Sequence, residues 1–479
     1  MSATSPKSPD RDARFCSRRQ LLWRAGAGIA GVALTDMLAR PAAAAAGSAL
    51  APRGGHFPAK ARAIISIFCY GGVSQVDTFD PKPELLRRQG EALTGKGEVV
   101  VSQGNPGGMM PSLWSFRKYG QCGMDVSELF PHVAQLVDRI ALIRSMYAVS
   151  NDHAPALFQM NTGTVLAGHP SLGSWATYGL GTENQSLPAF IVFTDPRGGP
   201  IGGSPNWGNG YMPAAFQGTQ FRSTGDPIVD LRPPKEMSPE RQRRWLRLMA
   251  TLNDEHRRRN PQDTELAARI ASYELAYRMQ THAVEAVDLE RETAATRRLY
   301  GLDEKITGYF GRQCLMARRL VERGVRFVQL YSGGGNFQES WDAHWDIRAN
   351  HQMHAAETDR PIAGLLRDLE SRGLLDSTLV IWHGEFGRMP ISQRMDGRDH
   401  NPLGFSIWLA GGGVRGGVIV GSTDEFGYRA QENRKSVNDL HATILHLLGL
   451  NHEKLTYFHN GRHMRLTDVS GSVIGEILA

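Results

Sequence analysis

The chain has 479 residues and a formal net charge of +6, a length that allows one large α/β domain or two to three smaller ones. Residues 1–46 hold seven Lys/Arg and three Asp, so this leader carries +4 and the rest of the chain only +2. A nearly neutral body excludes an electrostatic argument for nucleic-acid binding. The four cysteines are widely spaced without a CxxC pair, which excludes a disulfide-dense scaffold.

The first 46 residues predict an export signal. Arg18 and Arg19 precede a weakly hydrophobic segment at 25–34 and an alanine tract at 42–46, which is the order of regions in a signal peptide. The paired arginines indicate the twin-arginine export machinery. The apolar segment is shorter than the roughly 20 residues of a membrane span, and no later segment has the pattern of one. We therefore expect an exported chain, periplasmic or secreted, without a stable membrane span.

Residues 61–479 predict one α/β domain, preceded by a flexible linker at 47–60. Short continuous apolar runs are typical of strands buried on both faces of a sheet, and they occur at 63–70, 139–146, 187–194, 325–331, 378–382 and 405–409. The strand, helix, strand order around residues 128–138 favours a parallel sheet. Residues 238–323, where charged residues are interleaved with apolar ones at helical spacing, predict amphipathic helices that form an insertion or flank the sheet.

Acidic and imidazole residues follow three of these predicted strands. In chain order they are Asp77, then Asp342 with His344, then Glu385, Asp399 and His400. Because open α/β sheets bind ligands beyond the C-terminal ends of their strands, we expect these residues to meet at one edge. Imidazole nitrogen with carboxylate oxygen suits zinc, manganese and similar divalent ions. The pattern predicts a metal site, although Asp77 by itself also fits a turn-capping role.

Two further residues are candidates for a catalytic role. His153 lies at a predicted helix N-terminus, where backbone N–H groups and the helix dipole favour an anion. A lone histidine at such a position also fits a capping or core role. Arg388 follows Glu385 by three residues. Its guanidinium can bind a substrate oxyanion in a bidentate way or form a salt bridge to Glu385.

In this order the motifs resemble the domain of unknown function 1501 family, an exported group related to sulfatases and the alkaline phosphatase superfamily. The likeness runs from Arg18 to Leu450 and rests on the leader and on GGVSQVDTFDPKP at 71–83, WDAH at 341–344, GEFGR at 384–388, GRDH at 397–400 and DLHATILHLLGL at 439–450. It implies a sulfatase-like α/β fold with a mostly parallel central sheet, helices on both faces and a helical insertion.

The chain differs from sulfatases at the positions that bind metal and at the position of the nucleophile. Sulfatase-like chains end a strand with TLVIFTSDHG, whereas residues 378–387 read TLVIWHGEFG, so Glu385 replaces the metal-binding Asp and Phe386 the His. In the sulfatase nucleophile segment C-x-P-S-R this chain keeps the proline as Pro155 but places His153 at the nucleophile. The likeness therefore excludes a Ser, Thr or Cys covalent intermediate and formylglycine chemistry at that site. His153 can attack, ligate metal or act as general base.

We therefore expect an exported metal-dependent hydrolase of sulfate or phosphate esters, with a small-molecule or polysaccharide substrate. One or two divalent ions, with Zn, Mn, Mg and Ca not distinguished, activate water; the expected ligands are Asp77, Asp342, His344, Glu385, Asp399 and His400. The alternative is an exported binding or structural protein that keeps the metal but has no turnover. A mutase or isomerase is disfavoured, because export removes the protein from most phosphorylated metabolites.

Overall fold

The computed structural model describes residues 49–97, 99, 101–104, 106–223, 227–228, 237–260, 275, 278–279 and 285–479. The predicted signal peptide at 1–46 lies outside these residues. Leu50–Ala479 form one compact unit. Among the described helices, none is long and apolar enough to cross a membrane.

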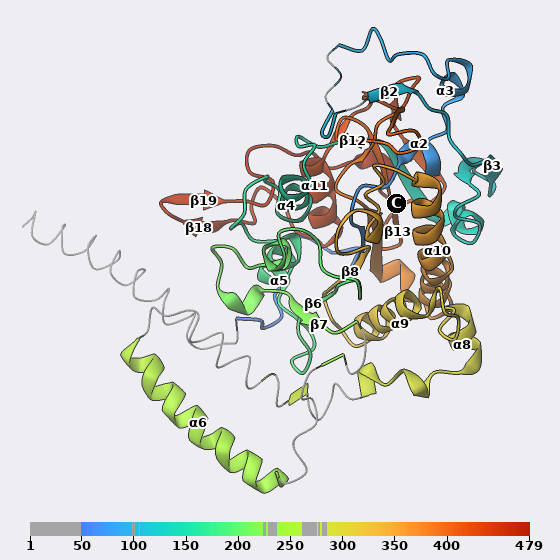
Figure 1. The fold of residues 1–479 in the computed structure, drawn as a ribbon. Coiled ribbons are helices and arrows are strands. Elements are labelled where there is room, and N and C mark those ends of the chain that lie inside the picture. Colours follow the sequence, from blue (N-terminus) through green and yellow to red (C-terminus); the bar gives the residue numbers. More distant parts are fainter. Residues whose placement is uncertain are drawn as a thin grey trace, which may run out of the picture. The chain divides into compact units, whose positions relative to one another are not determined.

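Within the described residues, a nine-stranded sheet organises the fold (Figure 1). The strands run in the order β14-β5-β13-β9-β1-β8-β6-β7, and β17 also pairs with β5. Their bounds are β1 (Ala63–Cys69), β5 (Ile140–Tyr147), β6 (Phe190–Phe193), β7 (Thr219–Phe221), β8 (Phe327–Ser332), β9 (Thr378–His383), β13 (Phe405–Ala410), β14 (Val418–Val420) and β17 (Lys435–Ser436).

The sheet is mostly parallel, as predicted. In its centre, β1 pairs in parallel with both β8 and β9. The exception is β13, which runs antiparallel to β9 and to β5. A parallel return needs a long crossover, usually a helix, but the chain between β9 and β13 holds only the short strands β10 (Gly387–Arg388), β11 (Ile391–Gln393) and β12 (His400–Asn401). The sequence located this strand but not its direction.

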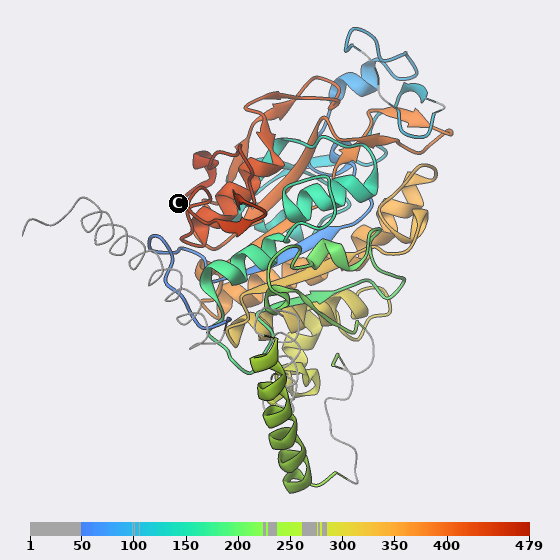
Figure 2. The ribbon, with the colours of Figure 1, turned by 90° about the vertical axis from the view of Figure 1, so that its left-hand side faces the viewer.

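Helices cover both faces of the sheet, as predicted (Figures 1 and 2). One face carries α4 (His153–Thr162), α5 (Leu172–Leu180) and α11 (Val437–Leu447), and the other carries α9 (Gly308–Glu322) and α10 (Ile347–Ser371). Along β1, Ile64 and Phe68 pack on the face that carries α4, α5 and α11. Ile65 and Ile67 pack on the face that carries α9 and α10. Because successive strand residues point to opposite faces, a strand covered on both sides needs the continuous apolar run seen in the sequence.

The remaining elements are shorter or peripheral. The segment predicted as a helix at 128–138 is a 3-10 helix at Val133–Arg139. In the region of predicted amphipathic helices, α9 flanks the sheet, and residues 261–274 lie outside the described part of the chain. The other bounds are α2 (Gln75–Thr78), α3 (Pro83–Arg87), α6 (Pro239–Arg259), α8 (Ala294–Leu299), β2 (Pro106–Met109), β3 (Phe116–Tyr119), β4 (Met124–Ser127), β15 (Ser422–Thr423), β16 (Ala430–Glu432), β18 (Tyr457–His459) and β19 (Arg462–Met464).

The segment expected to be a flexible linker, 47–60, is attached to the domain from Leu50 onward, where the carbonyl accepts from Thr182 N–H at 3.0 Å. The backbone N–H of Arg53 donates to the Leu180 carbonyl at 2.9 Å, and that of His56 donates to the Gly449 carbonyl at 2.8 Å. Lys60 N–H donates to the Leu447 carbonyl at 2.9 Å. The description as a linker is therefore corrected for residues 50–60, since tertiary hydrogen bonds hold a segment whose local sequence contains no strand or helix pattern.

Candidate metal centre

The candidate site lies beyond the C-terminal ends of four strands that run in the same direction, β1, β5, β8 and β9. His153 follows β5 as the first residue of α4, and the other predicted residues follow β1, β8 and β9. The eight predicted residues are all buried: Asp77, His153, Asp342, His344, Glu385, Arg388, Asp399 and His400. The sheet thus brings them to one edge, but their contacts divide them into different roles.

Three histidines converge on the carboxylate of Asp342. Nε2 of His344 lies 3.0 Å and Nε2 of His400 lies 3.1 Å from Asp342 Oδ1, and Nε2 of His153 lies 3.3 Å from Oδ2. The His153 and His400 ring centroids are 4.3 Å apart, and those of His344 and His400 are 4.6 Å apart. Phe386 packs against the rings of His153 and His400 and so helps to hold their orientation.

The second nitrogen of each ring faces an oxygen that accepts a hydrogen bond. Nδ1 of His153 is 2.7 Å from Glu385 Oε1, and Nδ1 of His400 is 2.7 Å from the carbonyl oxygen of Asn151. Nδ1 of His344 is 2.6 Å from Gln393 Oε1, and the Gln393 amide nitrogen donates to the Gly104 carbonyl, which fixes this orientation.

When a ring is neutral, its acceptor places the N–H on Nδ1 and leaves Nε2, the nitrogen nearest Asp342, able to ligate a metal. At His153, whose pKa is raised, an ion would displace the Nε2 proton. A ligating histidine in proteins usually donates its other N–H to such an acceptor. Two overlapping groups, one of His153, Asp342 and His400 and one of His344, Asp399 and His400, have ligand atoms within 4.8 Å of one another. The residues present therefore fit a divalent metal ion.

The electrostatics of the cluster centre on Asp342. Burial works to raise the pKa of Asp342, but Arg388 and the three histidines outweigh it and hold the pKa well below its usual range. Burial works to lower the pKa of His153, but the adjacent carboxylates of Asp342 and Glu385 raise it to about 9. Burial and the nearby His153 lower the pKa of His400 to about 3. Asp342 thus stays a carboxylate that requires positive charge beside it.

The predicted ligand Asp77 lies outside both groups. Its Oδ2 accepts hydrogen bonds from Arg398 Nε at 2.7 Å and from Ser74 Oγ at 2.5 Å. Arg398 and Asp77 are each fully buried. The expected role of Asp77 as a metal ligand is therefore replaced by an internal ion pair, whose partner the sequence analysis did not single out.

The carboxylates of Asp399 and Glu385 contact backbone N–H groups and the Nδ1 side of histidine rings. Asp399 Oδ2 accepts from the backbone N–H of Ser102 at 2.7 Å and of Gln103 at 3.2 Å, and its Oδ1 lies 3.7 Å from His344 Nδ1. Glu385 Oε1 accepts from Gly71 N–H at 2.9 Å besides its contact with His153. Both carboxylates thus order loops and rings, and Asp399 also belongs to the second candidate ligand group, with His344 and His400.

Arg388 is not available to a substrate. Nη2 donates to Asp342 Oδ1 at 2.7 Å, Nε to the Gly72 carbonyl at 2.8 Å, and Nη1 to the Arg398 carbonyl at 3.0 Å. The side chain is fully buried. Both sequence-based expectations are corrected, since among the described residues its acidic partner is Asp342 rather than Glu385 or a substrate oxyanion.

The sequence analysis missed Gln393, Arg398 and the Asn151 carbonyl. Arg398 stands directly before Asp399 and His400 in the GRDH motif, which was the only local signal for it. Nothing in the sequence distinguishes Gln393 from other polar loop residues.

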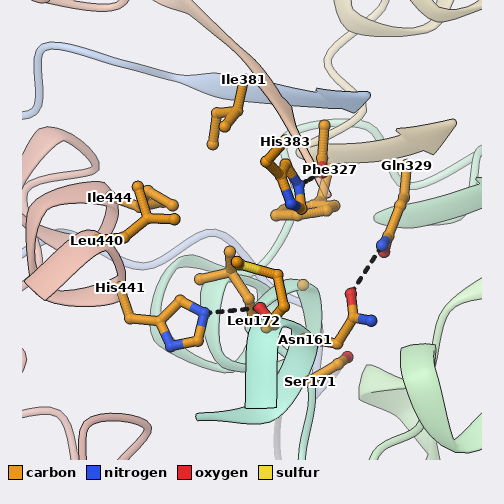
Figure 3. A pocket seen from close by; sticks show the side chains of 13 residues that line it. Asn161, Ser171, Leu172, Phe327, Gln329, Ile381, His383, Leu440, His441 and Ile444 are labelled. Carbon is orange, nitrogen blue, oxygen red and sulfur yellow. Dashed lines mark hydrogen bonds between the residues drawn. The ribbon is translucent and has the colours of Figure 1, made fainter. Parts of the chain in front are cut away.

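Two further buried histidines, His383 and His441, lie on the face covered by α4 and α11 (Figure 3). Nε2 of His383 is 2.8 Å from Ser66 Oγ, and Nε2 of His441 is 2.9 Å from the Met160 carbonyl. Burial lowers the pKa of His383 to about 3 and that of His441 to about 4. Both rings line a cavity of about 10 Å³, which is room for about one water molecule. They are neutral structural histidines, separate from the cluster at Asp342.

Comparisons with known proteins place this site in a family and a fold. The family described as "Protein of unknown function (DUF1501)" matches residues 61–478. None of the curated proteins compared with the chain matches it. Its solved structural neighbours include sulfatases and alkaline phosphatases.

Three solved structures represent these neighbours. The lipoteichoic acid synthase LtaP from Listeria monocytogenes is 9% identical, with a TM-score of 0.36 over 87% of this chain and 78% of that chain. The PsFucS1 sulfatase from Pseudoalteromonas sp. is 12% identical, with a TM-score of 0.34 over 82% and 68%. The alkaline phosphatase from the Antarctic bacterium TAB5 is 10% identical, with a TM-score of 0.35 over 82% and 99%. These similarities concern the fold and say nothing about a substrate.

Proposed function

The chain belongs to the DUF1501 family of proteins of unknown function, and we propose that it is a metal-dependent hydrolase of sulfate or phosphate esters that works without a covalent intermediate on residue 153. His153, His344, His400 and Asp342 would hold the metal. The proposal extends to export through the twin-arginine signal, so that the mature protein acts outside the cytoplasm.

The proposal rests on the missing hydrogen bonds of two buried histidine Nε2 atoms. Among the described residues, no group forms a hydrogen bond with Nε2 of His153 or of His344, although both atoms are buried. An unsatisfied buried polar atom costs about 1–3 kcal/mol, and both Nε2 atoms lie within 3.3 Å of an oxygen of Asp342. An ion bound by both nitrogens would remove this penalty. A divalent ion in this position supplies Lewis-acid chemistry, because it lowers the pKa of water and offsets the negative charge of an ester.

The chain's own residues orient the His153 ring and neutralise the Asp342 carboxylate. Glu385 holds the His153 ring by its Nδ1, and Arg388 holds the Asp342 carboxylate by Oδ1. His153 and Asp342 retain 7% and 6% exposure, whereas His344 has none, so solvent and substrate reach the cluster from the side of His153. α4 begins at His153, and its dipole adds positive potential where an ester anion approaches.

A non-catalytic metal-binding protein is the second candidate. It is favoured by one observation, that Arg388 is consumed by internal contacts and offers no N–H to an oxyanion. Both candidates bind metal, and only the first turns over an ester.

The test is turnover by the purified full chain loaded with metal, screened against aryl sulfates, phosphate monoesters and diesters, and sulfated polysaccharide. His153→Ala should lower kcat/KM by more than about 100-fold, because metal charge stabilisation is worth several kcal/mol in such reactions. His463→Ala, at an exposed histidine, is the matched control and should keep full activity. Metal binding without turnover of any ester in the wild-type chain would rule out the hydrolase in favour of the second candidate.

A further inference from the structure

We propose that the centre takes a single divalent ion of the zinc class, bound by Nε2 of His153, His344 and His400 and by the carboxylate of Asp342. The guanidinium groups of Arg388 and Arg398 supply the positive charge that a second ion would otherwise bring. This inference rests on the proposed metal centre and goes beyond it by naming the class and the number of ions.

The donor set selects the class of ion. Three imidazole nitrogens and one carboxylate are the ligand types of zinc and neighbouring late transition metals, whereas magnesium and calcium prefer sets made only of oxygen. Calcium also takes about 6–8 oxygen ligands, and the carboxylates of Asp77, Glu385 and Asp399 are all engaged elsewhere.

The spacing of the donors agrees with a small tetrahedral ion. Zinc bonds to nitrogen and oxygen are about 2.0–2.2 Å long, so the ligand atoms around a tetrahedral zinc are separated by about 3.3 Å. The three distances from the histidine Nε2 atoms to the Asp342 oxygens are 3.0, 3.1 and 3.3 Å. The carboxylate thus lies at tetrahedral spacing from each of the three rings. His153 and His344 fall in different candidate ligand groups that share His400, so an ion bound by all three rings would draw these two closer together.

The orientation of the rings is fixed before any ion binds. Each Nδ1 faces an acceptor that is itself held in place: Glu385 by Gly71 N–H, Gln393 by the Gly104 carbonyl, and the Asn151 carbonyl as part of the backbone. Such outer partners set the tautomer and the ring angle of a ligating histidine. Three rings oriented in this way toward one carboxylate point to one ion.

Two buried arginines argue against a second ion. Arg398 lies 2.7 Å from Asp77 Oδ2 and 3.3 Å from Oδ1, and Arg388 lies 2.7 Å from Asp342 Oδ1. Asp77 would be the main ligand of a second ion, and a guanidinium already neutralises it. A divalent ion placed there would have to displace a fully buried cation, which would then lack a partner.

The experiment measures bound metal in the full chain, independently of activity. The protein is stripped with a chelator and dialysed separately against Zn²⁺, Co²⁺, Mg²⁺ and Ca²⁺, and the metal retained per chain is determined by elemental analysis. We expect one Zn²⁺ or one Co²⁺ per chain, with the visible spectrum of four-coordinate Co²⁺, and no retained Mg²⁺ or Ca²⁺. Two ions per chain, retention of Mg²⁺ or Ca²⁺ in preference to Zn²⁺, or no metal at all would overturn the inference.

Variants identify the ligands. His344→Gln should abolish retention, and Glu385→Gln should weaken Zn²⁺ binding by about 10–100-fold, the usual effect of losing an outer-shell partner. His441→Gln, at a buried histidine outside the cluster, and His463→Gln, at an exposed one, are the controls and should retain one ion. An unchanged Co²⁺ spectrum in folded His344→Gln would overturn the ligand assignment. One Zn²⁺ without ester turnover contradicts the hydrolase alone, and turnover with two ions contradicts this inference alone.

Discussion

Glu385 illustrates how a residue next to the centre can be recognised from sequence while its role is not. It follows β9 and was expected to bind metal, but it accepts hydrogen bonds from His153 Nδ1 and Gly71 N–H. Asp342 and Arg388 likewise pair with each other. At the scale of single residues, the site is therefore a set of ligands together with the groups that hold them.

Arg388 should be important for stability even though no substrate reaches it. Arg388→Met leaves Asp342 as a buried charge that has lost its guanidinium, and breaking a buried pair in this way costs about 3–5 kcal/mol. Urea unfolding of the metal-free chain measures the effect. Arg117→Met, at an exposed arginine, should change the free energy of unfolding by no more than about 0.5 kcal/mol. Equal effects of the two substitutions would contradict the structural role of Arg388.

The buried neutral histidines predict sensitivity to acid. The pKa of His383 is lowered to about 3 and that of His441 to about 4, both below the unfolded value of about 6.5. The stability they contribute is therefore complete above about pH 6.5 and is lost as the pH falls toward about 4–3. At pH 5 we expect a loss on the order of 2 kcal/mol for each ring. Urea midpoints between pH 7.5 and 5 measure it, and His441→Gln should show a smaller decrease than the wild-type chain.

At the scale of elements, the site depends on how closely the loops after β1 and β8 approach each other. Gly71 has a φ of +112°, and a Cβ there would lie 2.5 Å from the backbone nitrogen of Asp342. Only glycine fits this crossing, because both the backbone angle and the contact exclude a side chain. A glycine at position 71 is therefore required by the position of Asp342 in the loop after β8.

Gly71→Ala should displace Asp342 and lower both stability and metal retention. Gly373→Ala is the matched control, since Gly373 also has positive φ, at +66°, but a Cβ there meets nothing within 4 Å. The control should cost only the backbone strain of roughly 1–2 kcal/mol and keep the metal. Thermal unfolding and metal analysis of both variants distinguish the cost of the backbone angle, which both share, from the steric clash with Asp342, which only Gly71→Ala has. Full metal retention by Gly71→Ala would show that the contact is less strict than the structure implies.

At the scale of the whole molecule, the centre joins segments that are far apart in the chain. His153 and Glu385 are 232 positions apart and meet at 2.7 Å. The segments after three strands, β5, β8 and β9, contribute to the cluster, so an ion bound there stabilises the folded state and not the unfolded one. This linkage connects the metal to global stability.

Metal should therefore raise the thermal midpoint of the full chain. At a free Zn²⁺ concentration of 100 times Kd, binding adds about 2.7 kcal/mol to the free energy of unfolding. Scanning calorimetry with Zn²⁺ and with chelator measures the difference, and His344→Gln should show none. An equal rise in the variant would mean that Zn²⁺ acts at another site.

Much of the fold followed from local pattern. The apolar runs located β1, β5, β6, β8, β9 and β13, and alternation of strands with helices gave a mostly parallel sheet. The direction of β13 could not be read, because it depends on the absence of a crossover helix rather than on the strand's own residues.

The sequence by itself determined which strand ends carry polar groups and that a histidine, His153, stands at the predicted helix start after the strand at 139–146. Only the tertiary structure decided what those groups do. Asp77 pairs with Arg398, and Arg388 pairs with Asp342, whereas three imidazoles face the same carboxylate. The physical reason is that a buried charge takes its role from the partner nearest in space, and those partners lie on different strands, at distances along the chain that no local pattern encodes.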